Sequence, residues 1–169
     1  GILFWVLGAI SYFVGMQGSV RKGYGGGPVG PEYNVKANIP AAQKALLAPW
    51  KQCTITPLDT CGLVRVSGDQ FERLIQSRDP LVQDVLENYR IWAKKSDVQE
   101  SSVLFDTVAV YLALPGPRRL LNLEDLRINV DSEGVTRIDS TGAPMKVATS
   151  WRNLDGYQDW FLRFLLPSH

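Results

Sequence analysis

The sequence is poor in the residues that most often carry acid–base, redox and metal chemistry. It has one histidine, His169, at the last position, and two cysteines, Cys53 and Cys61, among 169 residues. A catalytic histidine inside the fold is therefore effectively excluded for this chain. The cysteine spacing fits neither a zinc site nor a CxxC redox motif. Each cysteine is interpreted as a small buried hydrophobic residue, with half of a disulfide as the alternative, so the compartment stays undecided between cytoplasmic and secreted.

An excess of charge of either sign is also missing. The chain carries 18 basic and 17 acidic residues, for a net charge of +1, and the basic residues form no stripe. No nucleic-acid partner is therefore expected. Hydrophobic residues make up 45% of the chain, which suffices for a core, and the length predicts one domain over residues 1–169.

The longest uncharged run is the first sixteen residues, "GILFWVLGAISYFVGM". A membrane span needs about 20 apolar residues, and no basic region precedes this run as it would in a signal peptide. Strands buried on both faces of a parallel sheet are the favoured interpretation, and a membrane or signal anchor is the alternative. Residues 1–11 form an atypical apolar segment that we expect to dock a partner chain or a second copy, while membrane binding is not expected.

Strand and helix patterns alternate along the rest of the chain. Strands are predicted at "YFVGM", at "CTIT" and at three segments between residues 126 and 151. Helices are predicted after Asn38, after a capping box at Ser67, after Asp79, around "FDTVAVYLAL" and from Leu154. This alternation predicts an α/β fold with an open, mainly parallel sheet and flanking helices.

Polar residues follow the predicted strands at three places where ligands of such sheets bind. These are Glu32 and Asn34 in the loop after "YFVGM", Asp59 and Thr60 at the end of "CTITPLDT", and Asp106 before the helix "TVAVYLAL". Each has a structural alternative: solvated loop residues, a turn cap and a helix cap, respectively.

Two further motifs are interpreted as local structure. "GYGGG" at residues 23–27 lacks the GK[ST] sequence of a phosphate-binding loop and is interpreted as a flexible loop. "DSEG" at residues 131–134 begins like a calcium loop but lacks the remaining ligands, so a hairpin turn is predicted.

Three segments in this order resemble the C-terminal half of the inosine–uridine-preferring nucleoside hydrolases. They are "MQGS…PEYNVKANIPAA", "ITPLDT" and "LFDTVAVYLAL", and the resemblance covers about residues 12–166. It implies hydrolysis of the N-glycosidic bond of ribonucleosides with the help of bound Ca²⁺. By position, Asp106 would bind Ca²⁺ and a ribose hydroxyl, Glu32 and Asn34 would bind ribose hydroxyls, and Met16 would lie under the sugar.

The chain departs from that family at several positions. The N-terminal aspartate cluster that supplies most calcium ligands is missing, so the chain resembles a C-terminal half that needs another half for activity. Phe105 stands where many members have the histidine that protonates a purine, and Gly26 where members often have a sugar-binding asparagine. A non-catalytic α/β subunit that retains the fold is therefore the alternative to a hydrolase.

Overall fold

The computed structural model describes residues 11–116 and 120–166, which form two compact units. The first unit comprises residues 1–63 and 104–152, and the second comprises residues 64–103 and 153–169. Residues 1–10 lie outside the described residues, so the interpretations of the apolar segment and its partner stay predictions. The single domain predicted over residues 1–169 likewise stays a prediction.

Among the described residues, five strands form one sheet in the first unit. They are β1 (Tyr12–Met16), β2 (Gln52–Thr56), β3 (Leu121–Val130), β4 (Thr136–Ile138) and β5 (Ala143–Trp151), in the order β1-β2-β5-β3-β4. Strands β1, β2 and β5 are parallel, while β3 is antiparallel to both of its neighbours. Four strands therefore run in one direction, which confirms the open, mainly parallel sheet.

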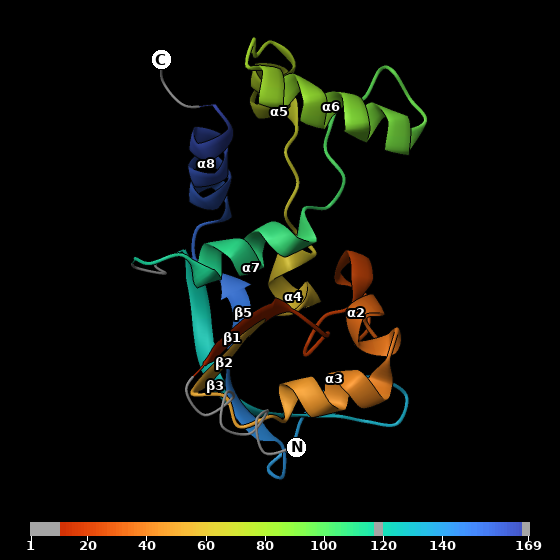
Figure 1. Ribbon diagram of the computed structural model, residues 1–169, viewed down its shortest axis with the longest axis vertical. Coiled ribbons are helices and arrows are strands. Elements are labelled where there is room, and N and C mark those ends of the chain that lie inside the picture. The colour runs from red at the N-terminus through yellow and green to blue at the C-terminus, as the bar shows by residue number, and fades with distance from the viewer. Residues whose placement is uncertain (1–10, 117–119, 167–169) are drawn as a thin grey trace. The chain divides into compact units, whose positions relative to one another are not determined.

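Helices cover both faces of this sheet (Figure 1). The helix α3 (Ile39–Leu46), with the short α2 (Tyr33–Lys36) before it, packs on one face, and α7 (Phe105–Ala113) packs on β1 and β2 at the other. The main core lies on the α3 side and includes Val35, Leu46, Cys53, Ile55, Ile128, Val130, Met145 and Val147.

Coverage on two faces explains why β2 does not alternate between apolar and polar residues. Cys53 and Ile55 point into the core, and the intervening Thr54 and the following Thr56 are fully buried as well. Threonine suits this position because its branched side chain packs in a strand and its hydroxyl can bond locally. Both cysteines are buried and free, as the sequence predicted.

Two predicted helix starts are confirmed by their capping bonds. Asn38 accepts from Ala41 N at 3.1 Å, and Asp79 accepts from Leu81 N at 2.8 Å at the start of α6 (Pro80–Ala93). The capping box is wrong: α5 (Gly68–Ile75) follows Ser67, but the Ser67 side chain makes no capping bond. Ser67 instead pairs with Glu100 in an isolated β-bridge, which fixes its backbone from outside the helix.

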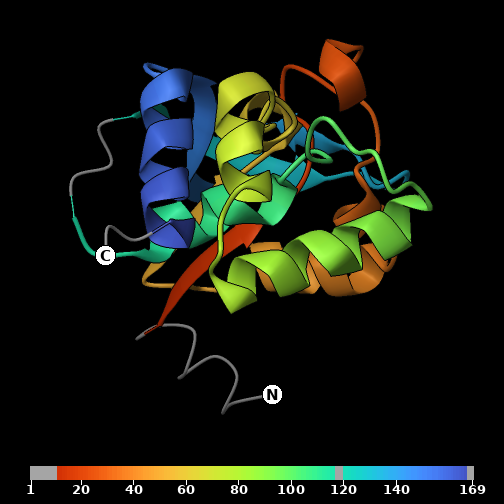
Figure 2. The same ribbon diagram turned by 90° about the horizontal axis from the view of Figure 1, so that it is seen from above.

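The second unit consists of α5, α6 and α8 (Leu154–Leu165) with their connections. Figure 2 shows α5 and α8 side by side, and Gln70 donates to Asp159 between them at 3.1 Å. None of the described helices is both long and apolar enough to cross a membrane.

The predicted "DSEG" hairpin turn between β3 and β4 is confirmed. The Asp131 carboxylate accepts from the N–H groups of Glu133 and Val135, each at 2.9 Å, and bonds to Arg137. These three bonds hold the Asp131 carboxylate within the turn.

An ion pair joins the loop after β1 to the opposite side of the sheet. The Arg21 guanidinium donates two bonds to Glu124 on β3, at 2.6 and 2.8 Å, and Thr149 on β5 donates to the same carboxylate. The bonds from Arg21 and then Thr149 lower the pKa of Glu124 to about 2. The charged form of Glu124 is therefore favoured by the fold.

This shift predicts an acid-dependent loss of stability. Because the folded pKa lies below the ordinary value of 4.5, the contribution of Glu124 is complete above about pH 4.5 and disappears as the pH falls towards about 2. We expect Glu124→Gln to lower the melting temperature at pH 7 and to leave it unchanged near pH 2. Melting curves across this range check the prediction.

Glu133→Gln is the matched control, because Glu133 is exposed and its side chain makes no hydrogen bond or ion pair within the described part of the chain. The control should follow the wild-type curve at every pH. Asp131 and Asp139 also have lowered pKa values, so part of the acid loss should survive in Glu124→Gln. Parallel curves for Glu124→Gln and wild type would contradict the assignment.

Candidate functional site

The turn after β1 occupies the carboxyl edge of the parallel strands, and side chains from elsewhere bind its backbone. Asp59 in α4 (Leu58–Cys61) accepts from Val20 N at 2.9 Å and from Arg21 N at 2.7 Å. The Asp59 side chain is nearly fully buried, so its charge depends on these two bonds. Asp59 therefore acts as a turn-fixing residue, which agrees with its structural alternative.

The two residues before Val20 are held in the same way. Ser19 N donates to the Thr136 hydroxyl at 2.8 Å, and that hydroxyl donates back to the Ser19 carbonyl oxygen. Gly18 has φ +80°, and an added Cβ would lie 2.5 Å from Thr136. Only glycine satisfies both the left-handed backbone and the close approach of Thr136. Four consecutive backbone N–H groups, from Gly18 to Arg21, thus bond to side chains of other segments.

Glu32 supplies the bond to Gly18 and also begins α2. Its carboxylate accepts from Gly18 N at 3.1 Å, Asn34 N at 2.8 Å and Val35 N at 3.4 Å, and the residue is 2% exposed. Such bonds stabilise a buried carboxylate in place of water. The sequence placed Asn34 in a loop, but it lies in the first turn of α2, because Glu32 caps that helix.

Asn34 turns its side chain towards the end of β1. Its amide nitrogen donates to the Met16 carbonyl oxygen at 3.1 Å and contacts the Met16 sulfur at 3.2 Å. Because the Met16 oxygen is an acceptor, the Asn34 carbonyl oxygen faces the other way. Asn34 is exposed, and within the described part of the chain this oxygen accepts no hydrogen bond. Asn34 thus offers a fixed and available acceptor beside the buried Met16.

Asp106 offers a second available acceptor. It lies in the first turn of α7, is exposed, and its carboxylate neither caps that helix nor forms an ion pair with any described residue. Burial, with smaller contributions from the charges of Glu32 and Asp106, raises the pKa of the Cys61 thiol to about 12. The helix α7 packs on α4, so Asp106 and Cys61 belong to neighbouring elements.

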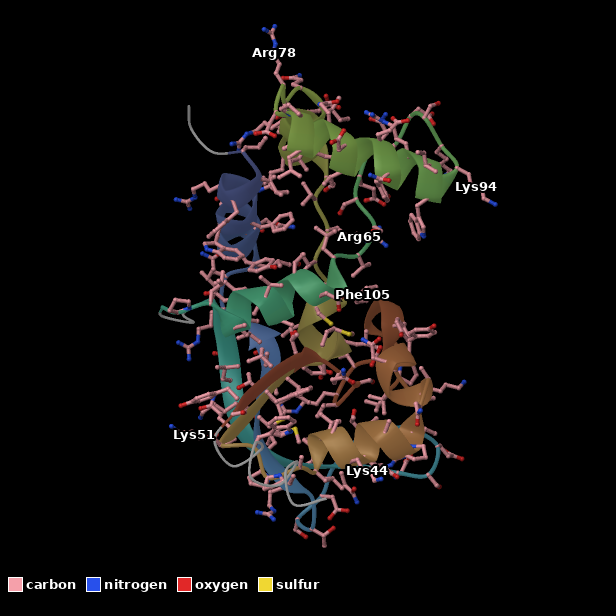
Figure 3. All side chains as sticks on the ribbon, viewed as in Figure 1. Lys44, Lys51, Arg65, Arg78, Lys94 and Phe105 are labelled. Carbon is pink, nitrogen blue, oxygen red and sulfur yellow. The ribbon has the colours of Figure 1, made fainter. Side chains whose placement is uncertain are left out.

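Aromatic contacts connect the two segments independently. Phe105, which precedes Asp106, meets the Tyr24 ring edge to face with centroids 6.2 Å apart. The Tyr24 hydroxyl accepts from Tyr33 N at 3.1 Å, between Glu32 and Asn34. Figure 3 shows Phe105 at the beginning of α7, next to α4. The structure therefore brings Met16, Glu32, Asn34 and Asp106 to one edge of the sheet, while their roles stay predictions.

Sequence reasoning missed Thr136 and Tyr24 as participants, and it located Thr60 at a strand end without its partners. Thr136 is 117 positions from Ser19, and no local sequence pattern predicts that the two residues bond to each other. Thr60 bonds to Thr56 and to the Ala148 carbonyl oxygen, which ties α4 to β5. Tyr24 was interpreted only as part of a flexible glycine loop. The position of Tyr24 between glycines is the one sequence signal that pointed to an exposed side chain at the end of a loop.

A calcium site does not fit the described residues alone. No group of three or more His, Cys, Asp or Glu residues in residues 11–116 and 120–166 could hold a metal ion. Glu32 and Asp59 are buried with their carboxylates bonded to backbone N–H groups, so Asp106 is the exposed acid of the candidate site. Ca²⁺ takes about six to eight oxygen ligands.

A separate cavity of about 340 Å³ lies at the opposite edge, lined by the beginnings of β2 and β5 and by residues 125–127 of β3. Met145 and Lys51 belong to its lining. In Figure 3 Lys51 lies far from Phe105, at the other end of the sheet. None of the candidate site residues contributes to this cavity.

Comparisons with known proteins show the fold. A purine-preferring ribonucleoside hydrolase from Gardnerella vaginalis is structurally similar, with a TM-score of 0.64 and 18% sequence identity. The match covers 89% of this chain and 50% of that protein, so the chain spans about half the length of its structural relative. No family model and no curated protein matches the sequence. The chain therefore has a nucleoside hydrolase-like α/β fold.

The bonds of Glu32 predict a loss of stability on Glu32→Gln. The variant amide would face its NH₂ group towards at least one of the three backbone donors, leaving a buried N–H without an acceptor. We expect a loss of about 1–3 kcal/mol in the free energy of unfolding. Urea denaturation without ligand measures it. Glu133→Gln, an exposed change in the same unit, should stay within about 0.5 kcal/mol of wild type. Equal stability of the two variants would show that Glu32 does not fix the turn.

Proposed function

We propose that this chain holds the ribose-binding part of a ribonucleoside N-glycoside hydrolase. The observation that carries the proposal is the pair of available acceptors, the Asn34 carbonyl oxygen and the Asp106 carboxylate. The Asn34 side chain contacts Met16 at the end of β1, and Asp106 lies in the first turn of α7, which packs on β1. The carboxyl edge of the parallel strands is where open α/β sheets bind ligands. The nucleoside hydrolase-like fold supports the same assignment.

The chemistry of N-glycoside hydrolysis explains why such residues would gather there. Positive charge builds on the sugar ring as the bond to the base breaks. In the proposal, Asn34 accepts a bond from a ribose hydroxyl and Asp106 accepts another, and the charge of Asp106 favours the cationic ring. Met16 packs under the sugar. Contacts that tighten as the charge builds would accelerate the reaction more than they strengthen substrate binding.

Glu32 acts mainly through Asn34 in this proposal. Its oxygens already accept three backbone N–H bonds, and two of these fix α2 and therefore the Asn34 side chain. One acceptor position remains on the carboxylate, which can bond four donors. A bond from Glu32 to a ribose hydroxyl stays a prediction that uses this position.

Hydrolysis needs a further acidic segment. Asp106 is the one available candidate calcium ligand among the described residues, so a proposed Ca²⁺ ion would need most of its oxygens from outside them. The length of the structural relative is consistent with such a segment, since the chain matches half of it. The ribonucleoside is the proposed substrate of the completed protein.

Ribose binding can be tested on the chain itself, because it has two methionines with separate positions. Met16 lies at the candidate site, and Met145 lies at the opposite edge of the sheet. With methyl-labelled methionine, ribose should shift the NMR signal of Met16 and leave that of Met145 unchanged. Asn34→Ala should weaken the response about tenfold or more, because it removes the acceptor next to Met16.

Asn88→Ala is the control variant, because Asn88 is an exposed amide on α6 in the other unit. Its ribose response should equal that of wild type. Equal shifts of Met16 and Met145 would indicate nonspecific binding. A Met16 signal that ignores ribose at every concentration would contradict the proposed function.

Calcium titration tests whether the site is incomplete. Isothermal calorimetry with Ca²⁺ on this chain should show no tight site, because Asp106 alone supplies too few oxygens. Addition of a segment that completes the site should create calcium binding and hydrolysis, and Asp106→Asn should abolish both. Micromolar calcium binding by this chain alone, lost in Asp106→Asn, would contradict the need for a further segment.

A further inference from the structure

The cavity of about 340 Å³ at the beginnings of β2 and β5 lies apart from the candidate ribose site. Its size is near the lower end of the range of pockets that hold small molecules in proteins, about 300–1,000 Å³. Part of its lining is apolar and consists of Trp50, Cys53, Leu126, Pro144 and Met145. The polar part includes three basic residues and one acidic residue, namely Lys51, Arg127, Lys146 and Asp125. The cavity therefore combines an apolar surface with an excess of positive charge.

Trp50 is the aromatic part of this lining, and two contacts hold it in place. Its indole N–H donates to the Ala45 carbonyl oxygen of α3 at 2.6 Å, and its ring lies against Phe13 of β1 with centroids 5.4 Å apart. Trp50 stays half-buried, while Met145 and Cys53 in the same lining are each 4% exposed. Because these side chains are already ordered, a flat apolar group can pack against them at little entropic cost.

Arg127 and Lys51 supply positive charge that no described acid neutralises. Arg127 Nε donates to the Ser140 carbonyl oxygen at 2.8 Å, and its other N–H donors make no hydrogen bond or ion pair to the described residues. The Lys51 ammonium lies 5.3 Å from the centre of the Tyr12 ring, a contact without an opposing charge. Lys146 differs from both, because it is paired with Asp125 at 2.8 Å.

We propose that this cavity binds a small organic carboxylate with a planar apolar body, as a second site separate from the ribose site. The carboxylate accepts hydrogen bonds from the N–H donors of Arg127, with the charge of Lys51 in support, and the apolar body packs beside Trp50. A guanidinium presents parallel N–H donors that match the two oxygens of a carboxylate. Strand residues line most of the cavity, and the lining includes no helix N-terminus of the kind that often binds phosphate. A carboxylate is therefore favoured over a phosphate.

Met145 provides a signal for this cavity, because it belongs to the lining, whereas Met16 lies at the ribose site. With methyl-labelled methionine, phenylacetate should shift the NMR signal of Met145 and leave that of Met16 unchanged. 2-Phenylethanol has the same ring without the charge, and it should bind about tenfold more weakly because charge-assisted hydrogen bonds are lost. Acetate should also bind at least about tenfold more weakly, because it has no apolar body to bury.

Variants of the two unneutralised cations test the position of the carboxylate. Arg127→Gln should weaken phenylacetate binding about tenfold, because it removes charged donors. Lys51→Gln should weaken it about threefold, as expected for an exposed charge without a fixed hydrogen bond. Both residues are exposed, so both variants should fold. Lys44→Gln is the control, because Lys44 is exposed on α3 outside the lining, and its affinity should equal that of wild type.

Several outcomes would overturn the proposal. Equal affinities for phenylacetate and 2-phenylethanol, or unchanged phenylacetate binding in both Arg127→Gln and Lys51→Gln, would show that the cavity does not recognise a carboxylate. Tighter binding of phenyl phosphate than of phenylacetate would overturn the choice of carboxylate. Equal shifts of Met16 and Met145 would show nonspecific binding of the ring, and a Met145 signal that ignores phenylacetate at every concentration would show that the cavity is not a binding site. The response of Met16 to ribose tests the proposed function separately.

Discussion

The bonds that side chains make to the backbone of residues 18–21 are the constraint on which the site depends. Glu32, Asp59 and Thr136 come from three different segments, and together they bind four consecutive N–H groups after β1. A turn without helix or sheet partners would otherwise leave buried donors unpaired, at a cost of about 1–3 kcal/mol each. By accepting hydrogen bonds from those N–H groups, the three side chains fix the end of β1, the start of α2 and the position of α4. Met16 and Asn34 take their places from this arrangement.

The same constraint divides the acidic residues into two groups. Glu32 and Asp59 are buried, and their carboxylates accept hydrogen bonds from backbone N–H groups. Their charges therefore stabilise the fold in the absence of a ligand. Asp106 is exposed, and its carboxylate has no hydrogen-bond partner among the described residues. A binding site needs a rigid frame and a few available polar groups, and this edge of the sheet has both. The free acceptors are few, which is why the proposed chemistry needs residues from outside the described chain.

Tyr24 connects two segments of the candidate site, because its hydroxyl accepts from the backbone of α2 and its ring meets Phe105 at the start of α7. The glycines around it close the loop that presents this ring. A single loop therefore links the segments that carry Asn34 and Asp106.

The sequence by itself determined the order and type of most elements, because strand and helix periodicities and the caps Asn38 and Asp79 are local signals. It also located the polar residues at strand ends, including Asn34 and Asp106. It could not distinguish a ligand-binding carboxylate from one that fixes a turn, because Glu32 and Asp59 differ from Asp106 only in their distant partners. The pairing of Ser19 with Thr136 and the meeting of Tyr24 with Phe105 join residues 117 and 81 positions apart. Tertiary structure alone decided these contacts, since they arise when the sheet brings separate segments to one edge.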